Sequence, residues 1–325
     1  GDRLKGPIGH FIDTMAVVAT MFGLATTLGL GIQHINSGMH HLFGIVENTN
    51  VQVILIAIIT IFSTISVVSG LHKGVQILSK IASIMAVLLM IFMLVVGPTL
   101  FILGSTIQST GYYLQNIIST GTWMEVYKGT SWMGSWTLFY WGWWFAWAPF
   151  VSLFIARISK GRTIKELLIG VVLAPSVLSI LWISIFGSTA LHIELFGEGN
   201  ITAAVNENIT TALFSLLEHF PLSYFSILFV VIAGIIFFVT SSDSGSLVID
   251  FITSGGREKT TVWLRIFWAL AEGLVAATLV YGGGLIALQT GSLVTGLPVC
   301  ILMLFLCYSI LKALRKYQAD SEIKP

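Results

Sequence analysis

The sequence predicts an all-α membrane protein with about eight membrane-crossing helices in one bundle. Of its 325 residues, 55% are hydrophobic and only 10% are charged, whereas soluble domains carry about 25% charged residues. Several apolar runs approach or exceed the roughly 20 residues that a helix needs to cross a bilayer. No segment has the composition of a separate soluble domain, so we treat residues 1–325 as a single transmembrane bundle.

The apolar runs place the spans in order along the chain. We expect helices at Phe11–Ile32, Val51–Val68, Ile81–Leu103, Trp136–Ile155, Leu167–Ser188, Phe225–Ser242, Thr261–Tyr281 and Ser292–Leu314. Between the third and fourth spans, Ile107–Ser119 is amphipathic and too short to cross, which is typical of a helix lying on the outer membrane surface.

The basic residues test this topology independently. With the N-terminus on the cytoplasmic side, all of the 16 lysines and arginines except Lys128 fall on the inner side. The positive-inside rule predicts such a bias. An added or lost span would mix the two sides, so the distribution supports eight spans in a multi-pass protein of the cell inner (plasma) membrane.

The first residues of the chain bear on whether the sequence is a fragment of a longer protein. It opens at Gly1 without a methionine, and no signal peptide is recognisable before the first long helix. This indicates a fragment, with processing or a chosen boundary as the alternatives.

Aromatic residues crowd the predicted helix Trp136–Ile155. Trp136, Tyr140, Trp143 and Trp147 follow one another at intervals of four, three and four residues, so they line one helical face. Ring faces attract a cation without hydrogen bonds, and several rings around one space can hold a quaternary ammonium group. An aromatic belt at the membrane interface, the alternative, accounts for one or two rings near a helix end. The pattern favours an aromatic cage.

Three charged residues lie at or within predicted spans. Arg157 and Asp243 each end a helix on the inner side, and we interpret them as an inner-gate ion pair, the alternative being two unrelated charges at headgroup level. Glu272 falls in the middle of a span, where an ionisable residue is a candidate functional group. The alternative for Glu272 is a protonated carboxyl bonded to a neighbouring helix.

Three separated segments resemble the betaine/choline/carnitine transporter family: Phe11–Gly38, Thr130–Glu166 and Phe237–Asp250. The resemblance implies a leucine-transporter-type fold of two inverted five-helix repeats with a central site. It assigns residues 1–103 to the end of repeat one, 104–135 to an outer loop with the interfacial helix, and 136–325 to repeat two. The family has twelve helices, so the resemblance implies that the first four are absent. It also implies a homotrimer.

The same resemblance assigns roles to individual residues. Trp143, Trp144 and Trp147 match the family's box for a trimethylammonium group, and Phe154 matches an aromatic residue on the inward path. Thr240, Ser241 and the carbonyl of Phe237 match a sodium site. For Thr240 and Ser241 the alternative is hydroxyls that bond back to their own helix, which is common in membranes. Trp136 and Trp141 are more simply explained by packing.

A second sodium site is less complete. Thr20 matches one of the two hydroxyls that the family places one turn apart on the first span, but Leu24 occupies the other position. Sodium-independent members carry an arginine on that span, whereas no lysine or arginine occurs between Lys5 and Lys73. This favours sodium-coupled symport over exchange.

The sequence gives one leading hypothesis for the function and several alternatives. The first is a sodium-coupled symporter that imports a compact quaternary ammonium osmolyte such as glycine betaine, with sodium as the coupling ion and no other cofactor. The second is a sodium-independent carnitine/betaine exchanger or a non-transporting membrane protein that binds onium compounds. A membrane enzyme is disfavoured, because no motif pairs a nucleophile with a base, and nothing in the sequence indicates nucleic-acid binding.

Overall fold

The computed structural model describes residues 6–69, 72–197, 199–257 and 260–322, and its elements are helices. In chain order they are α1 (Pro7–Phe43), α2 (Thr49–Ser69), α3 (His72–Val96), α4 (Thr99–Gly121), η2 (Met133–Leu138), α5 (Phe139–Ile158), α6 (Ile164–Leu168), η3 (Ile169–Leu173), α7 (Ala174–Phe196), α8 (Ile201–Glu207), η4 (Ile209–Thr211), α9 (Ala212–Glu218), α10 (Ser223–Thr253) and α11 (Val262–Glu322). The prediction of an all-α membrane protein is confirmed.

Within the described residues, seven helices are long and apolar enough to cross a membrane. The prediction of eight spans differs in the last two, Thr261–Tyr281 and Ser292–Leu314, because α11 runs through both and through the loop expected between them. α11 bends at Gly284, whose φ of 55° and ψ of −135° are not helical. Two crossings are therefore joined by a kink at a glycine.

Two other predicted boundaries are wrong for a local reason. The third span was expected to reach Leu103, but α3 ends at Val96, where Gly97 and Pro98 follow. Proline lacks a backbone donor and disfavours a helical conformation in the residue before it. The Thr99 hydroxyl then donates to the Leu94 carbonyl at 2.7 Å and so satisfies an acceptor at the end of α3. The interfacial helix consequently starts earlier than expected, at Thr99, and becomes α4.

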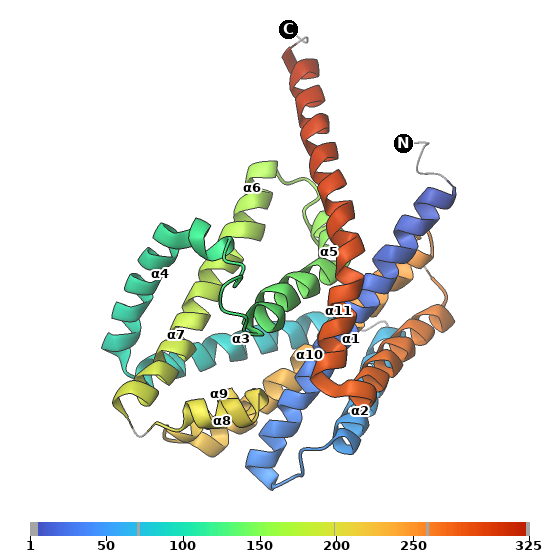
Figure 1. The fold of residues 1–325 in the computed structure, drawn as a ribbon. Coiled ribbons are helices and arrows are strands. Elements are labelled where there is room, and N and C mark those ends of the chain that lie inside the picture. Colours follow the sequence, from blue (N-terminus) through green and yellow to red (C-terminus); the bar gives the residue numbers. More distant parts are fainter. Residues whose placement is uncertain (1–5, 70–71, 198, 258–259, 323–325) are drawn as a thin grey trace.

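α1 is the central element of the bundle. It begins with Pro7 in the first turn and ends at Gly44, which adopts a left-handed φ of 69°, the usual signals for the start and the end of a helix. In its most apolar stretch 67% of the residues are buried, against at most 33% in the other candidate spans. Figure 1 shows α1 between α2 and the first half of α11 on one side and α5 on the other.

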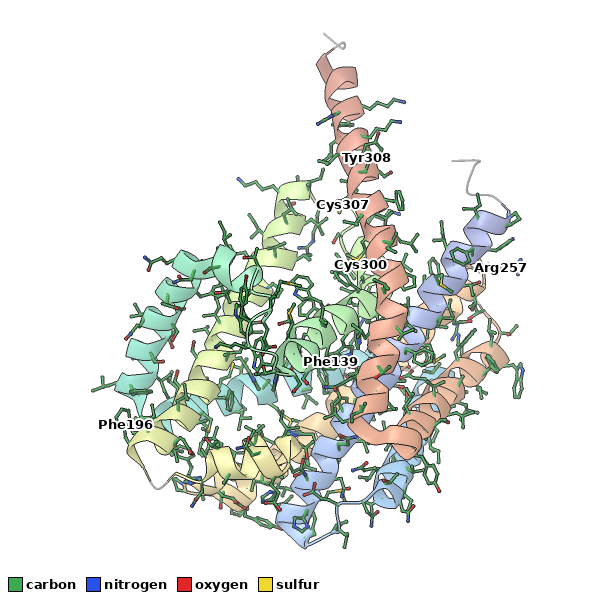
Figure 2. The ribbon with its side chains drawn as sticks, in the orientation of Figure 1. Phe139, Phe196, Arg257, Cys300, Cys307 and Tyr308 are labelled. Carbon is green, nitrogen blue, oxygen red and sulfur yellow. The ribbon has the colours of Figure 1, made fainter. Side chains whose placement is uncertain are left out.

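Both ends of the described chain lie on the same side of the bundle (Figure 1). The start of α1, the start of α6 and the end of α11 lie at the same end of the molecule, as an even number of crossings requires (Figure 1). Figure 2 shows Arg257 toward that end and Phe196 toward the opposite one. Much of the outer surface of the helices is apolar, including Ile61 and Phe62 on α2 and Leu100 on α4, as expected of surfaces that face lipid.

The kink at Gly284 yields a matched pair of variants. Gly284→Ala should lower the free energy of unfolding by roughly 1–3 kcal/mol, because an L-residue is strained at this φ and ψ. Gly282→Ala, two residues earlier with open space around its Cβ position, should be neutral or slightly stabilising, because alanine is the better helix former. Thermal unfolding of both purified variants measures the difference. Equal melting temperatures would show that the kink does not depend on glycine.

Candidate binding site

The tryptophan helix α5 crosses α1 at a point where both helices carry small side chains. Ala19 on α1 and Ala146 on α5 are fully buried and pack with Val299 of α11. Gly23 lies one turn beyond Ala19, and a Cβ added to it would lie 2.9 Å from the Trp147 ring atom Cδ1. Small residues at a crossing let two membrane helices approach closely. The indole rings of α5 therefore reach the backbone of α1.

Two tryptophans bind the same pair of acceptors on α1. The Trp147 Nε1 group donates to the Gly23 carbonyl and to the Thr27 Oγ1 atom, both at 3.0 Å. The Trp143 Nε1 group donates to the same two atoms, both at 3.2 Å. The Thr27 hydroxyl in turn donates to the Gly23 carbonyl at 3.0 Å. Both indole edges are thus fixed by a single turn of α1.

This arrangement uses every donor that the two rings possess. An indole has one N–H donor and no acceptor, and a hydroxyl has one donor and two acceptor positions. The Thr27 hydroxyl therefore uses its full capacity, and neither Trp143 nor Trp147 retains a free N–H group. What the rings still offer is their π faces, which attract cations. Gly23 and Thr27 were not expected in this role.

The other aromatic side chains continue a row along α5. Trp136 stacks on Tyr140 at 6.0 Å between ring centroids, and Tyr140 meets Trp143 edge-on at 6.0 Å. Further along, Phe150 contacts Trp147 at 5.2 Å. Phe150 also stacks on Phe154 at 6.3 Å. The row follows the spacing seen in the sequence, although Trp136 lies in the π-helical segment η2. Phe154, predicted to line the inward path, is 47% exposed.

Trp144 and Trp141 lie away from the crossing of α1 and α5. Trp144 is 70% exposed and lines a hollow of about 700 Å³ together with Tyr113 of α4 and Pro175 and Ile180 of α7. Trp141 is 60% exposed and stacks on Phe145. The structure therefore brings Trp143 and Trp147 of the predicted box together and places Trp144 on a different face of α5.

The predicted sodium residues lie on α10. The Thr240 hydroxyl donates to the Phe237 carbonyl at 3.0 Å, so two of the three predicted ligands are in direct contact. Thr240 is buried and Ser241 is half-buried. The Phe237 side chain is 53% exposed. The observed bond within α10 also fits the alternative, in which the hydroxyl bonds back to its own helix.

The predicted second sodium position, on α1, has apolar surroundings, unlike the predicted position on α10. The Thr20 hydroxyl is buried and has no hydrogen-bond partner among the described residues. Leu24, one turn later, is 2% exposed and packs in an apolar cluster with Met21 and Ile249. A leucine in such a cluster offers no ligand atom, so the residues present do not complete a second sodium shell around Thr20.

Of the two residues of the predicted inner gate, the structure describes the side chain of Asp243. Asp243 is 3% exposed, and Ser66 of α2 donates to it at 3.4 Å. The side chain of Arg157 lies outside the described part of the structure, so the pairing of Arg157 with Asp243 stays a prediction.

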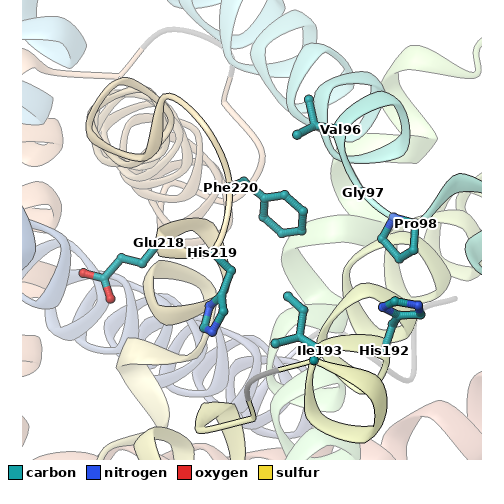
Figure 3. Close-up of a pocket in the computed structure, with 9 residues that line it drawn as sticks. Val96, Gly97, Pro98, His192, Ile193, Glu218, His219 and Phe220 are labelled. Atoms are coloured by element: carbon teal, nitrogen blue, oxygen red, sulfur yellow. The ribbon is translucent and has the colours of Figure 1, made fainter.

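A further cavity lies away from this site, at the end of the bundle opposite the start of α1. It measures about 750 Å³, and Figure 3 shows Pro98, His192, Glu218, His219 and Phe220 around it. None of the predicted substrate or sodium residues lines it. Within the described residues there is no group of three or more His, Cys, Asp or Glu side chains that could hold a metal ion.

Comparison with known proteins identifies relatives of the chain. The family model described as betaine/carnitine/choline family transporter matches residues 1–319. The glycine betaine transporter OpuD of Bacillus subtilis is 42% identical over 98% of this chain and 62% of its own length. A glycine betaine transporter of Acinetobacter baylyi is 39% identical over all of this chain and 50% of its own length. A glycine betaine/proline/choline/ectoine transporter of Vibrio parahaemolyticus is 42% identical over 97% of this chain and 56% of its own length. The chain thus spans about half to two thirds of the length of these relatives.

The shared acceptor on α1 can be tested by substitution. Gly23→Ala should displace the Trp147 ring, because the new methyl group would overlap ring atom Cδ1 and α5 cannot retreat from α1 without losing packing. We expect a loss of stability of about 1–3 kcal/mol and a shift in tryptophan fluorescence. Gly187→Ala on α7, where the nearest atom lies 4.0 Å away, is the control and should change neither. Unchanged fluorescence in Gly23→Ala would argue against the Trp147 contact.

Proposed function

The chain belongs to the betaine/carnitine/choline transporter family, and we propose that it forms the binding core of a sodium-coupled symporter for a compact quaternary ammonium solute, glycine betaine first among them. Two relatives are named for glycine betaine, and a third for proline, choline and ectoine as well. A trimethylammonium group has no N–H to donate, so its receptor must recognise charge and shape through aromatic faces.

The observation that supports this substrate class is the shared anchoring of Trp143 and Trp147. Their N–H groups are both bound to Gly23 and Thr27, so neither ring can act as a hydrogen-bond donor to a solute. Ring faces held in fixed positions lose little entropy on binding, and each desolvated contact with a cation contributes up to about 2 kcal/mol. A betaine carboxylate must then take its donors from other groups.

Sodium is the proposed coupling ion, and Thr240, Ser241 and the Phe237 carbonyl are its proposed ligands. The support is chemical: sodium prefers hard oxygen ligands, and helix carbonyls and hydroxyls supply them inside membranes. The Thr240 hydroxyl and the Phe237 carbonyl already lie 3.0 Å apart. An inner-membrane location, a cytoplasmic N-terminus and a homotrimeric assembly are also part of the proposal, and the distribution of the basic residues supports the orientation. The alternatives are a sodium-independent exchanger and an onium-binding protein without transport.

Substitution of the anchored rings tests the substrate site. Trp143→Leu and Trp147→Leu should each raise the half-saturating concentration of glycine betaine tenfold or more, since a loss of about 1.4 kcal/mol is tenfold. The measurement is counterflow of labelled glycine betaine in proteoliposomes. Trp141→Leu is the matched control, because this exposed ring of the same helix stacks on Phe145 and on no other ring of the described residues, and it should leave the constant unchanged. Trp144→Leu then shows whether the third predicted ring takes part. Unaltered affinity in both Trp143→Leu and Trp147→Leu would refute the cage.

Substitution on α10 tests the coupling ion. The double variant Thr240→Ala, Ser241→Ala should lose the stimulation of uptake by sodium, because it removes both hydroxyl ligands. Ser244→Ala is the control: its hydroxyl donates to the Thr240 carbonyl within α10 at 2.9 Å, and sodium stimulation should persist. Uptake without sodium by the unsubstituted protein would contradict symport and favour the exchanger. Binding of glycine betaine without any flux would favour the non-transporting alternative.

A further inference from the structure

Glu272 is a buried carboxyl that the proposed transport site does not use. It lies in the first half of α11 and is 1% exposed. None of the ion pairs between described residues includes it, and the nearest basic residue of its helix that forms one, Arg265, pairs with Asp250 instead. A lone carboxylate in an apolar interior is expensive unless a proton, a cation or hydrogen bonds compensate its charge. Its surroundings therefore decide what it binds.

Hydroxyl groups from two neighbouring helices converge on Glu272. Ser246 of α10 donates to the Oε2 atom at 3.2 Å, and Ser242, one turn earlier on α10, also hydrogen-bonds the carboxyl group. Ser63 of α2 donates to the Ser242 hydroxyl at 3.1 Å. Ser63, Ser242 and Ser246 are all at most 4% exposed. A connected polar cluster thus joins α2, α10 and α11.

A fourth hydroxyl lies against this cluster. Thr60 is one turn from Ser63 on α2 and is 7% exposed, and its Oγ1 atom has no hydrogen-bond partner among the described residues. The same atom lies only 2.2 Å from the position that a Cβ on Gly273 would take, so it is directed at the α11 backbone beside Glu272. A buried hydroxyl without a partner loses the hydrogen bonds that it makes in water, so a ligand that contacts Thr60 would stabilise the folded protein.

The hydroxyls of Ser63 and Ser246 differ from most hydroxyls in membrane helices in where their hydrogen bonds go. Thr64, Ser244 and Thr253 bond back to carbonyls of their own helices, the common pattern in apolar surroundings. Ser63 and Ser246 instead bond across helices. A neutral carboxyl donates its one proton to one acceptor, whereas a cation contacts several oxygen atoms at once. One carboxylate with several hydroxyls is a ligand set for a hard cation.

We propose that Glu272, together with Thr60, Ser63, Ser242 and Ser246, forms a site for a sodium ion that ties α2 and α10 to α11. The site is distinct from the proposed coupling site, because Thr240 bonds within α10 to Phe237, whereas Ser242 and Ser246 face Glu272. One sodium ion neutralises Glu272 and supplies a partner for Thr60.

The test is thermal unfolding of the purified protein as sodium replaces potassium at constant ionic strength. A bound ion stabilises the folded state by mass action, so sodium should raise the melting temperature. The rise should persist in Thr240→Ala, Ser241→Ala, which removes the proposed coupling site. Adding Glu272→Gln should abolish the rise, and Thr60→Val or Ser246→Ala should each raise the half-saturating sodium concentration about tenfold, which corresponds to the loss of one ligand interaction of about 1.4 kcal/mol. Thr278→Val, an exposed residue of α11 that bonds its own helix, is the control.

Each outcome is decisive. A sodium effect that disappears with Thr240 and Ser241 alone, or that survives Glu272→Gln, overturns the second site. Stabilisation by low pH without any effect of sodium also overturns it and identifies a protonated carboxyl. Should Glu272→Gln fail to fold, unchanged sodium dependence in both Thr60→Val and Ser246→Ala would be enough to reject the site. Because no substrate or flux is involved, failure here leaves the proposed transport function untouched.

Discussion

The burial of polar groups on α1 is the constraint on which the rest of the bundle depends. No water hydrogen-bonds the middle of a membrane helix, so a buried hydroxyl is stabilised only where it finds a partner on its own helix or on a neighbour. α1 is the most buried of the candidate spans and still carries Thr26 and Thr27 at its centre. Thr27 accepts from two tryptophans of α5. Thr26 donates to the Leu288 carbonyl of α11 and accepts from Ser292. Two successive residues thus fix the positions of two different helices.

The bonds that fix α5 also determine what its rings can recognise. Both indole donors are used within the protein, so the rings contribute charge attraction and shape but no directional hydrogen bond. An amine that must donate its N–H groups gains little from such a surface, whereas a trimethylammonium group loses nothing. Selectivity for onium compounds is therefore consistent with the orientation of the rings.

The sequence predicted most of the fold, because apolar length and loop charge are properties of single segments. Its errors fall where one or two residues decide. Gly97 and Pro98 end α3 early, and Gly284 bends α11 where a loop was expected. At the site, the spacing of the aromatic residues predicted the row along α5. It did not predict that Gly23 and Thr27 hold Trp143 and Trp147, because a backbone carbonyl at a glycine leaves no pattern in the sequence. The position of Trp144 on another face follows from how α5 packs on α1, which periodicity alone does not specify.

The hydrogen bond between Thr240 and Phe237 bears on how tightly an ion can bind at the proposed coupling site. A sodium ion between these two oxygens would replace an existing bond of 3.0 Å, since the hydroxyl hydrogen must turn away to expose the oxygen. The affinity is then the difference between ion coordination and a hydrogen bond that already satisfies both groups. This competition lowers the affinity for the ion, and a weakly held ion can be released after it has shifted the conformational equilibrium. At Glu272 no such compensation is in place for Thr60. An ion there would gain Thr60 as a ligand without breaking a bond of that residue, but it would compete with the hydrogen bond from Ser246 to Glu272, so its affinity also is a difference between ion coordination and existing hydrogen bonds.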